Sequence, residues 1–186
     1  MEAVNSTHIL QVLPTADIHK KTVSLDISVA KAKGGEKVKV ELLDEGKVVG
    51  TTEQKLASKI EMEVPEAVLW SPSSPKLYHL NIELLSQGQV IDQVKSYFAM
   101  REVSIRKDEC GYQRICLNGD PIFQYGTLDQ GWWPDGLLTP PSEEAMLWDM
   151  VQLKNMGFNT IRKHIKVEPE QYYYCLLYTS DAADEL

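Results

Sequence analysis

Apolar residues alternate strictly with polar ones along several short stretches in the first half of the chain, and this pattern constrains the fold most. In 22–30, for example, Val23, Leu25 and Ile27 fall on one side of an extended backbone. Such a period of two is typical of a half-buried strand. The pattern returns in three further stretches, 37–43, 59–64 and 77–85, separated by turn residues and by no helical pattern. Residues 1–98 are therefore predicted to form an antiparallel β-sandwich of immunoglobulin-like size.

The pattern changes after this first region. Short strands are predicted at 103–106 and 113–117, and Asn118–Gly119 is a dipeptide that favours a tight hairpin turn. The short apolar run at 122–125 is predicted to be one more strand. The second region therefore has a different organisation from the first.

A helix with clear start and stop signals comes next. Ser142 can cap its start, Glu143 and Glu144 lie in the first turn where the helix dipole favours acids, and Gly157 can end it in a left-handed conformation. Apolar residues recur at helical spacing between these signals, at Met146, Met150 and Leu153.

A second strand is predicted at 158–161, and Pro169 is placed to open a second helix. The order of strand, loop, helix, strand and helix start is the beginning of a parallel βα array. In barrels built from such units, active-site loops follow the carboxyl ends of the strands. Residues 99–174 are therefore predicted to form the first βα units of an incomplete (β/α)8 barrel.

The stretch GTLDQGWWPDG, residues 126–136, has glycines at both ends, a proline and no periodicity, so it is predicted to be a loop. Loops that carry large aromatic and acidic residues are often functional, so Trp132, Trp133 and Asp129 are candidate binding residues. Two simpler readings stay open. One tryptophan could belong to the core, and Asp129 or Asp135 could fix the loop through an Asx turn.

Composition excludes some classes of partner. The formal net charge of −8 and the lack of a basic stripe disfavour nucleic acid and anionic membranes as partners. No stretch approaches the roughly 20 apolar residues that span a bilayer. The cysteines at 110, 116 and 175 have neither metal-ligand spacing nor a disulfide framework. The compartment stays open, because the true start of the protein could lie upstream of Met1.

Four stretches occur in an order that resembles glycoside hydrolase family 2, which includes β-galactosidases, β-glucuronidases and β-mannosidases. They are LWSPSSPKLY (69–78), FAMREVSI (98–105), LNGDPIFQYGTLDQGWWPDG (117–136) and GFNTIRKHIKVEP (157–169). The resemblance covers the chain up to Tyr174. It implies a sandwich followed by the first two strands of the barrel, in an enzyme that hydrolyses β-linked sugars by a retaining mechanism.

The resemblance also implies roles for particular residues. Trp132 and Trp133 could stack on the apolar face of a sugar ring, and Asp129 could accept hydrogen bonds from sugar hydroxyls. Arg162 matches the family's Asn-x-x-Arg motif, whose arginine orients the catalytic carboxylates. His164 is a weaker candidate for binding substrate, because the family's histidine lies slightly further on, next to an aromatic residue and a proline. Both catalytic glutamates lie later in the family's barrel, so this chain is expected to lack them and to be inactive alone. No cofactor and no metal site in this chain are implied; whether a cation assists the whole enzyme, and whether that enzyme is a homo-oligomer, stay open.

The last segment, CLLYTSDAADEL (175–186), departs from the family pattern. It back-translates to an adapter used in transposase-based DNA sequencing, which predicts a non-native tail; a genuine polar C-terminus is the alternative. For the protein as a whole, the alternative to a hydrolase fragment is a non-catalytic carbohydrate-binding or scaffold sandwich. A scaffold sandwich would end or repeat after residue 99, whereas this chain continues with βα units.

Overall fold

The computed structural model describes residues 4–56 and 59–178 and divides into two compact units. The first contains the residues up to Trp70 together with Lys76–Glu102, and the second contains Ser71–Pro75 and the residues from Val103 onward.

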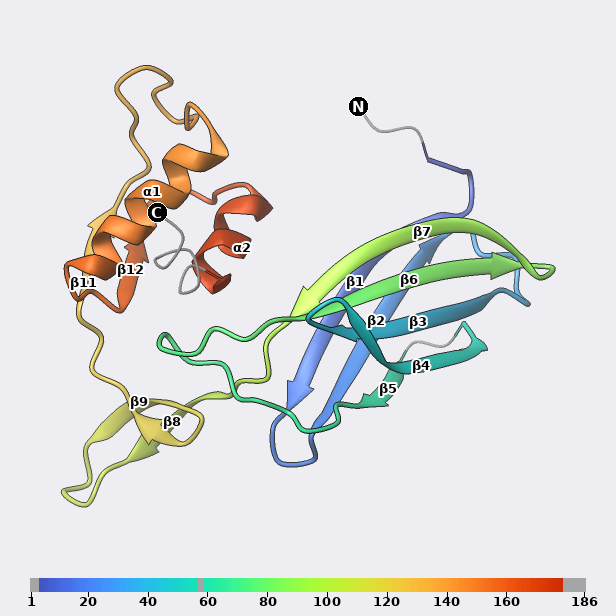
Figure 1. The fold of residues 1–186 in the computed structure, drawn as a ribbon, viewed down its shortest axis with the longest axis horizontal. Coiled ribbons are helices and arrows are strands. Elements are labelled where there is room, and N and C mark those ends of the chain that lie inside the picture. Colours follow the sequence, from blue (N-terminus) through green and yellow to red (C-terminus); the bar gives the residue numbers. More distant parts are fainter. Residues whose placement is uncertain (1–3, 57–58, 179–186) are drawn as a thin grey trace. The chain divides into compact units, whose positions relative to one another are not determined.

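The first unit is a sandwich of two antiparallel sheets, with strand orders β1-β2-β5 and β4-β3-β6-β7. In Figure 1, β1 and β2 pass behind β3 and β6 as a separate layer. The strands are β1 (His8–Asp17), β2 (Thr22–Ala30), β3 (Lys37–Asp44), β4 (Lys47–Lys55), β5 (Ile60–Glu63), β6 (Tyr78–Ser86) and β7 (Gln89–Phe98). The predicted β-sandwich is confirmed.

The core of the sandwich consists of the alternating apolar residues that the sequence pattern indicated. Leu25, Leu42, Leu80 and Ile82 are completely buried. Because successive side chains of a strand point to opposite faces, the residues between them remain on the outer surfaces. Other completely buried members are Val23, Val38, Val40, Ile60, Tyr78 and Leu84.

Strand β1 was not predicted from the sequence. It pairs with β2 along its whole length, from His8 opposite Ala30 to Asp17 opposite Thr22. Pro14 lies inside it, and proline lacks the N–H that a central strand needs on both sides. The strand tolerates Pro14 because β1 is the edge of its sheet.

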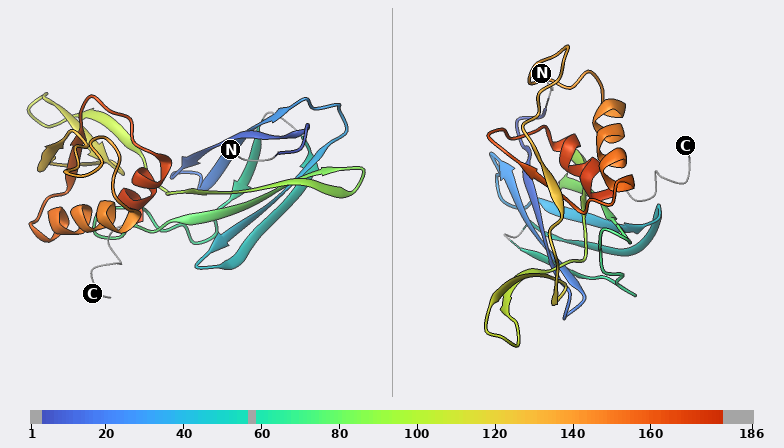
Figure 2. Two further views of the ribbon diagram at one scale, coloured as in Figure 1. Left: turned by 90° about the horizontal axis from the view of Figure 1, so that it is seen from above. Right: turned by 90° about the vertical axis from the view of Figure 1, so that its left-hand side faces the viewer.

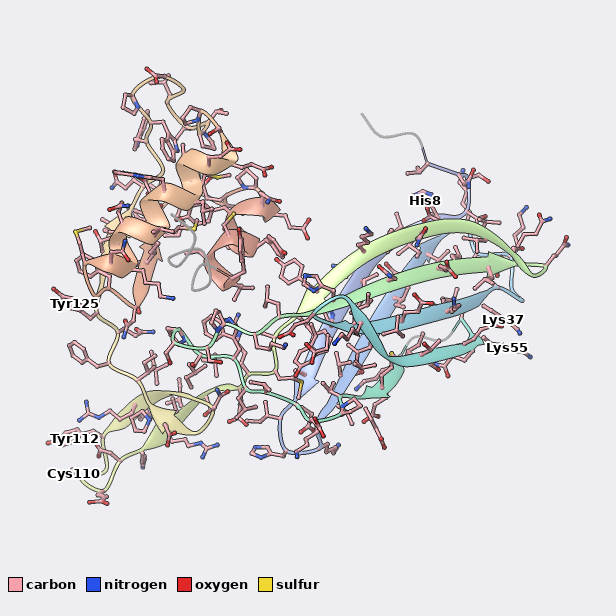
Figure 3. All side chains as sticks on the ribbon, viewed as in Figure 1. His8, Lys37, Lys55, Cys110, Tyr112 and Tyr125 are labelled. Atoms are coloured by element: carbon pink, nitrogen blue, oxygen red, sulfur yellow. The ribbon has the colours of Figure 1, made fainter. Side chains whose placement is uncertain are left out.

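Tight turns with positive φ at both central residues connect several hairpins. Glu45 and Gly46 have φ of 46° and 76° between β3 and β4, and Asn118 and Gly119 have φ of 53° and 93° in the second unit. Such turns match the twist of the paired strands. The turn predicted at Asn118–Gly119 is therefore confirmed. At the other end of β3 and β4, Lys37 lies opposite Lys55 (Figure 3).

The second unit begins with a small antiparallel sheet of order β10-β9-β8. Its strands are β8 (Val103–Lys107), β9 (Gln113–Leu117) and β10 (Asp120–Pro121). Tyr112 and Cys110 lie at the tip of the β8–β9 hairpin (Figure 3). Val103 and Ile105 of β8 are 68% and 69% exposed.

The rest of the second unit is a parallel strand pair joined by a helix. Strand β11 (Gly126–Asp129) is followed by α1 (Glu143–Asn155), β12 (Thr160–Lys163) and α2 (Glu170–Tyr178). Gly126 pairs with Thr160 and Asp129 with Lys163, in parallel register. Figure 2 shows α1 and α2 beside this strand pair.

Both strand positions predicted in this region are wrong by a few residues. The strand lies at 126–129, inside the predicted loop, and not at 122–125; its partner lies at 160–163, and not at 158–161. The physical cause is Gly126, where a Cβ atom would lie 1.8 Å from the carbonyl oxygen of Thr160. Only glycine permits this approach, so this register of the pair requires glycine at position 126.

The signals for α1 are confirmed. The Ser142 hydroxyl accepts a hydrogen bond of 3.2 Å from the N–H of Ala145, and Gly157 has a φ of 88° after the helix. Met146 and Met150 face inward and form a small core with Tyr172 and Cys175 of α2.

Residues 175–178 of the predicted tail form the last turn of α2, and 179–186 lie outside the described residues. The foreign origin of 175–186 therefore stays a prediction. Among residues 4–56 and 59–178, neither helix has the length and apolar character needed to cross a membrane.

Candidate functional site

The candidate site lies where the parallel strands β11 and β12 end. Asp129 and Lys163 are register partners and the last residues of their strands. Because the strands are parallel, the loops that follow them, 130–142 and 164–169, leave from the same edge of the sheet. All five predicted sugar-contacting residues lie in the last two residues of these strands or just beyond them.

The strand pair has two faces with different surroundings. Ile161 packs against the core of Met146 and Tyr172, so its face is the one covered by the helices. Side chains alternate along a strand, so Lys163 and its partner Asp129 share that covered face. Arg162 belongs to the opposite face, where it pairs in register with Leu128, and both side chains are exposed. The structure thus separates Asp129 from Arg162.

The Asp129 carboxylate is engaged inside the chain. Its Oδ1 accepts a hydrogen bond of 2.7 Å from the N–H of Gly131, which is an Asx turn. Its Oδ2 accepts from Lys163 Nζ at 2.8 Å and from the Tyr172 hydroxyl at 2.7 Å. These donors fill three of the roughly four acceptor positions that a carboxylate offers.

The pKa of Asp129 reflects both burial and these bonds. Burial raises the pKa, but the hydrogen bonds from Lys163, Tyr172 and Gly131 outweigh it and hold the pKa below its usual value. For Lys163, burial lowers the pKa, but hydrogen bonds to Asp129 and Glu168 outweigh it and raise the pKa. Both groups therefore carry their charges at neutral pH.

Lys163 and Asp129 belong to a buried ionic cluster of four residues, which also includes Lys166 and Glu168. Lys163 Nζ contacts Glu168 Oε1, and Lys166 Nζ lies 2.9 Å from Glu168 Oε2. The Glu168 side chain is only 2% exposed. Two lysines and two carboxylates balance in charge, as buried ions require.

Arg162 and His164 remain accessible. Among the described residues, Arg162 has no ion-pair partner and its side chain is exposed. His164 is half-buried; its backbone N–H donates to the Asp129 carbonyl oxygen at 2.9 Å, and its Nδ1 lies 3.4 Å from Gln130 Nε2. The backbone pairing of β11 and β12 therefore continues one residue past β12.

The two tryptophans differ in environment. Trp132 is 62% exposed, whereas Trp133 packs against the helix core of Met146 and Tyr172. Both line a hollow of about 390 Å³ in the second unit. Its walls also include Asp129, Lys163 and residues of α1 such as Trp148. One tryptophan is thus available to a ligand and the other is part of the core.

Sequence reasoning missed the residues that organise this site, namely Lys163, Lys166, Glu168 and Tyr172. The available signal was the density of charge in KHIKVE directly after a predicted strand. No group of three or more His, Cys, Asp or Glu side chains that could hold a metal ion occurs within the part of the chain that the structure describes.

Comparisons with known proteins agree on one family. The family model described as glycosyl hydrolases family 2 matches residues 7–101. A putative beta-glucuronidase from Formosa agariphila is 34% identical over 91% of this chain, and a beta-galactosidase large subunit from Latilactobacillus sakei is 25% identical over 84%. The chain spans 17% and 25% of the lengths of these relatives.

Solved structures support the same fold. A crystal structure of a beta-glycosidase from Bacteroides vulgatus superposes with a TM-score of 0.78, covering 95% of this chain and 23% of that one at 22% identity. Beta-glucuronidase 3 from Bacteroides uniformis gives a TM-score of 0.75 over 94% of this chain and 22% of that one, at 23% identity.

Proposed function

The chain belongs to glycosyl hydrolases family 2, and from this premise we propose that it is part of a β-glycosidase that hydrolyses β-linked sugars. The observation that carries the proposal is the extent of the likeness to the putative β-glucuronidase. That likeness covers 91% of the chain and so reaches well beyond the sandwich. A scaffold or binding sandwich alone would not account for the similarity of the second unit.

Within that enzyme, we assign residues 1–98 to an immunoglobulin-like domain and 99–174 to the first βα units of a (β/α)8 barrel. The parallel β11–α1–β12 unit supports the second assignment, because a helix crossover between parallel strands is the repeating element of such barrels. Its open strand edges would pair with the remaining strands of the barrel.

The sugar-contacting residues in this proposal are Trp132, Arg162 and His164. The ring of Trp132 is accessible for stacking, and Arg162 and His164 can donate hydrogen bonds to sugar oxygens or orient catalytic carboxylates. Asp129 and Trp133 support the site without contacting the sugar. Asp129 belongs to the ionic cluster, and Trp133 packs against the helix core.

Catalysis itself is assigned to sequence beyond this chain. Retaining glycosidases need two carboxyl groups about 5–5.5 Å apart, one of which is protonated as the general acid. The pKa of Asp129 is lowered, and both Asp129 and Glu168 pair with Lys163. These two carboxylates therefore suit a structural role and not acid catalysis. The proposal therefore expects a later Asn-Glu pair and a second glutamate in the uninterrupted gene.

The test compares the chain with the protein encoded by the uninterrupted reading frame. We expect the longer protein to release nitrophenol from 4-nitrophenyl β-D-glycosides and the 186-residue chain to show no turnover above a heat-treated control. In the longer protein, Trp132→Ala is expected to raise KM by roughly two- to tenfold, which corresponds to the roughly 0.5–1.5 kcal/mol that an aromatic stacking contact contributes. Tyr112→Ala, which removes an equally exposed aromatic ring, serves as the control. Turnover by the short chain, or an inactive longer protein, would refute the proposal.

A further inference from the structure

The segment from Gly131 to Leu138 carries the exposed Trp132 and is closed by its own backbone. The Trp133 N–H donates to the Leu137 carbonyl at 2.7 Å, and the Leu137 N–H donates back to Trp133 at 3.1 Å. These two hydrogen bonds close the loop between residues 133 and 137. Trp132 lies just before this bridge, so its direction depends on how the start of the loop is held.

Lys166 holds both ends of this loop. Its Nζ lies 3.4 Å from the Gly131 carbonyl oxygen and also donates to the Leu138 carbonyl oxygen. The same ammonium pairs with Glu168 Oε2 at 2.9 Å. The ammonium thus donates hydrogen bonds to the first and last residues of the loop and forms an ion pair, without a hydrogen bond, with a buried carboxylate.

Glu168 fixes the direction of the Lys166 ammonium. Its side chain is 2% exposed, its Oε1 contacts Lys163, and its backbone N–H donates to the Tyr173 hydroxyl at 3.2 Å. A charge that is buried and paired on both oxygens has few alternative positions. The side chain of Lys166 is only 15% exposed, and its ammonium is therefore held next to the loop.

Gly131 completes the contact between the loop and the cluster. It has a φ of 68°, and a Cβ atom there would lie 2.5 Å from Glu168 Oε1 and 2.9 Å from Lys163 Nζ. The start of the loop is therefore packed directly against the charged groups, with no room for a side chain between them.

We propose that Lys166 and Glu168 are positioning residues that hold the Trp132 ring in place for a sugar. The proposal rests on the proposed function in one respect, namely that Trp132 stacks on a sugar. An aromatic ring on a free loop loses conformational freedom when a ligand binds, and a ring already fixed by the protein avoids that cost. Lys166 and Glu168 thus act through Trp132 and do not contact the sugar.

The direct test measures the mobility of the Trp132 ring in the 186-residue chain. Nuclear relaxation of the ¹⁵N-labelled indole group, assigned with Trp132→Phe, gives its order parameter without any ligand. We expect Lys166→Met and Glu168→Gln to lower the order parameter of Trp132 and to leave that of Trp133 unchanged. Lys166→Arg, which keeps the positive charge and several donors, should restore most of the order. Lys107→Met, an exposed lysine of β8, is the matched control.

A second experiment measures the Kd of the same variants for methyl β-D-glucuronide and methyl β-D-galactoside by titration. We expect Kd to rise about three- to tenfold in Lys166→Met and Glu168→Gln, and to recover in Lys166→Arg. An unchanged Trp132 order parameter in Lys166→Met would overturn the positioning role. Unfolding of the second unit in both Lys166→Met and Glu168→Gln would also overturn it, because the two residues would then be general stabilisers. If the ring loosens as expected but neither glycoside binds the wild-type chain, the positioning role stands and the sugar-binding role of Trp132 fails.

Discussion

Replacing Lys163 with methionine is expected to loosen the second unit of the chain and to leave the sandwich intact. Lys163 Nζ pairs with Asp129 at 2.8 Å and contacts Glu168, and its side chain is only 13% exposed. Methionine has a similar length and fills a similar volume, so the change removes mainly the positive charge.

The size of the effect follows from the two carboxylates that stay behind. Removing one partner of a buried ion pair costs about 3–5 kcal/mol, because the other charge remains buried without compensation. Asp129 is 30% exposed and Glu168 keeps Lys166, so both retain some compensation. We therefore expect a loss of about 3 kcal/mol in the local stability of β11, α1 and β12, at the lower end of that range.

The loss of local stability in Lys163→Met should become smaller as the pH falls. In the wild type, the pKa of Asp129 in the folded chain is below its usual value. The stabilisation that Asp129 provides is therefore complete above the unfolded pKa of about 3.9. It is lost only as the pH falls through the lower pKa of the folded chain. Without Lys163, the pKa of Asp129 rises, and Asp129 in the variant takes up its proton at a higher pH. The difference in stability between wild type and variant should therefore narrow as the pH falls from the variant's Asp129 pKa towards the lower pKa of the wild type.

Amide hydrogen exchange measures this local stability segment by segment. The amides of β3 and β6 are an internal reference, because they belong to the first unit. Lys107→Met controls for the loss of an exposed lysine, and adding Glu168→Gln to Lys163→Met should recover part of the protection by removing one buried charge. A change below about 0.5 kcal/mol at β11 and β12, the range of ordinary surface substitutions, would refute the reasoning.

Three further predictions follow from packing and strand pairing. Gly126→Ala is expected to separate β11 from β12, because its Cβ would lie 1.8 Å from the Thr160 carbonyl oxygen; exchange at β12 should rise, whereas Gly50→Ala, where the nearest atom is 3.7 Å away, should not increase exchange in its own unit. Leu80→Ala is expected to destabilise the sandwich by about 3–5 kcal/mol in urea unfolding, because the side chain is completely buried. Limited proteolysis of the chain should cleave the second unit first and leave a core near residues 5–100, because the open edges of β11 and β12 make that unit folded but less stable than the sandwich; uniform protection of the second unit would contradict this.

Much of the sandwich could be predicted because its strands carry their own signal. Each buried residue of β3, such as Val40 and Leu42, follows the period of two along the sequence itself. Strand β1 escaped prediction because Pro14 argues against a strand unless its edge position is known. That position depends on the whole sheet and not on the nearby sequence.

The candidate site was harder to predict because it depends on the pairing of residues that are far apart in the sequence. Asp129 meets Lys163 in a register of β11 on β12 that a side chain at position 126 would not allow. A shift of one residue would move Lys163 to the other face. The sequence pattern identified Trp132 as a candidate and the family resemblance identified Arg162, but neither could indicate that Asp129 turns away from Arg162.

The buried ionic cluster also bears on how the chain responds to salt. Dissolved ions screen exposed charge pairs, such as Lys37 with Glu53, whose side chains are 54% and 45% exposed. They reach the cluster poorly, because the side chains of Lys163, Lys166 and Glu168 are 15% exposed or less. The loops at the carboxyl ends of β11 and β12 should therefore keep their arrangement from dilute buffer to molar sodium chloride.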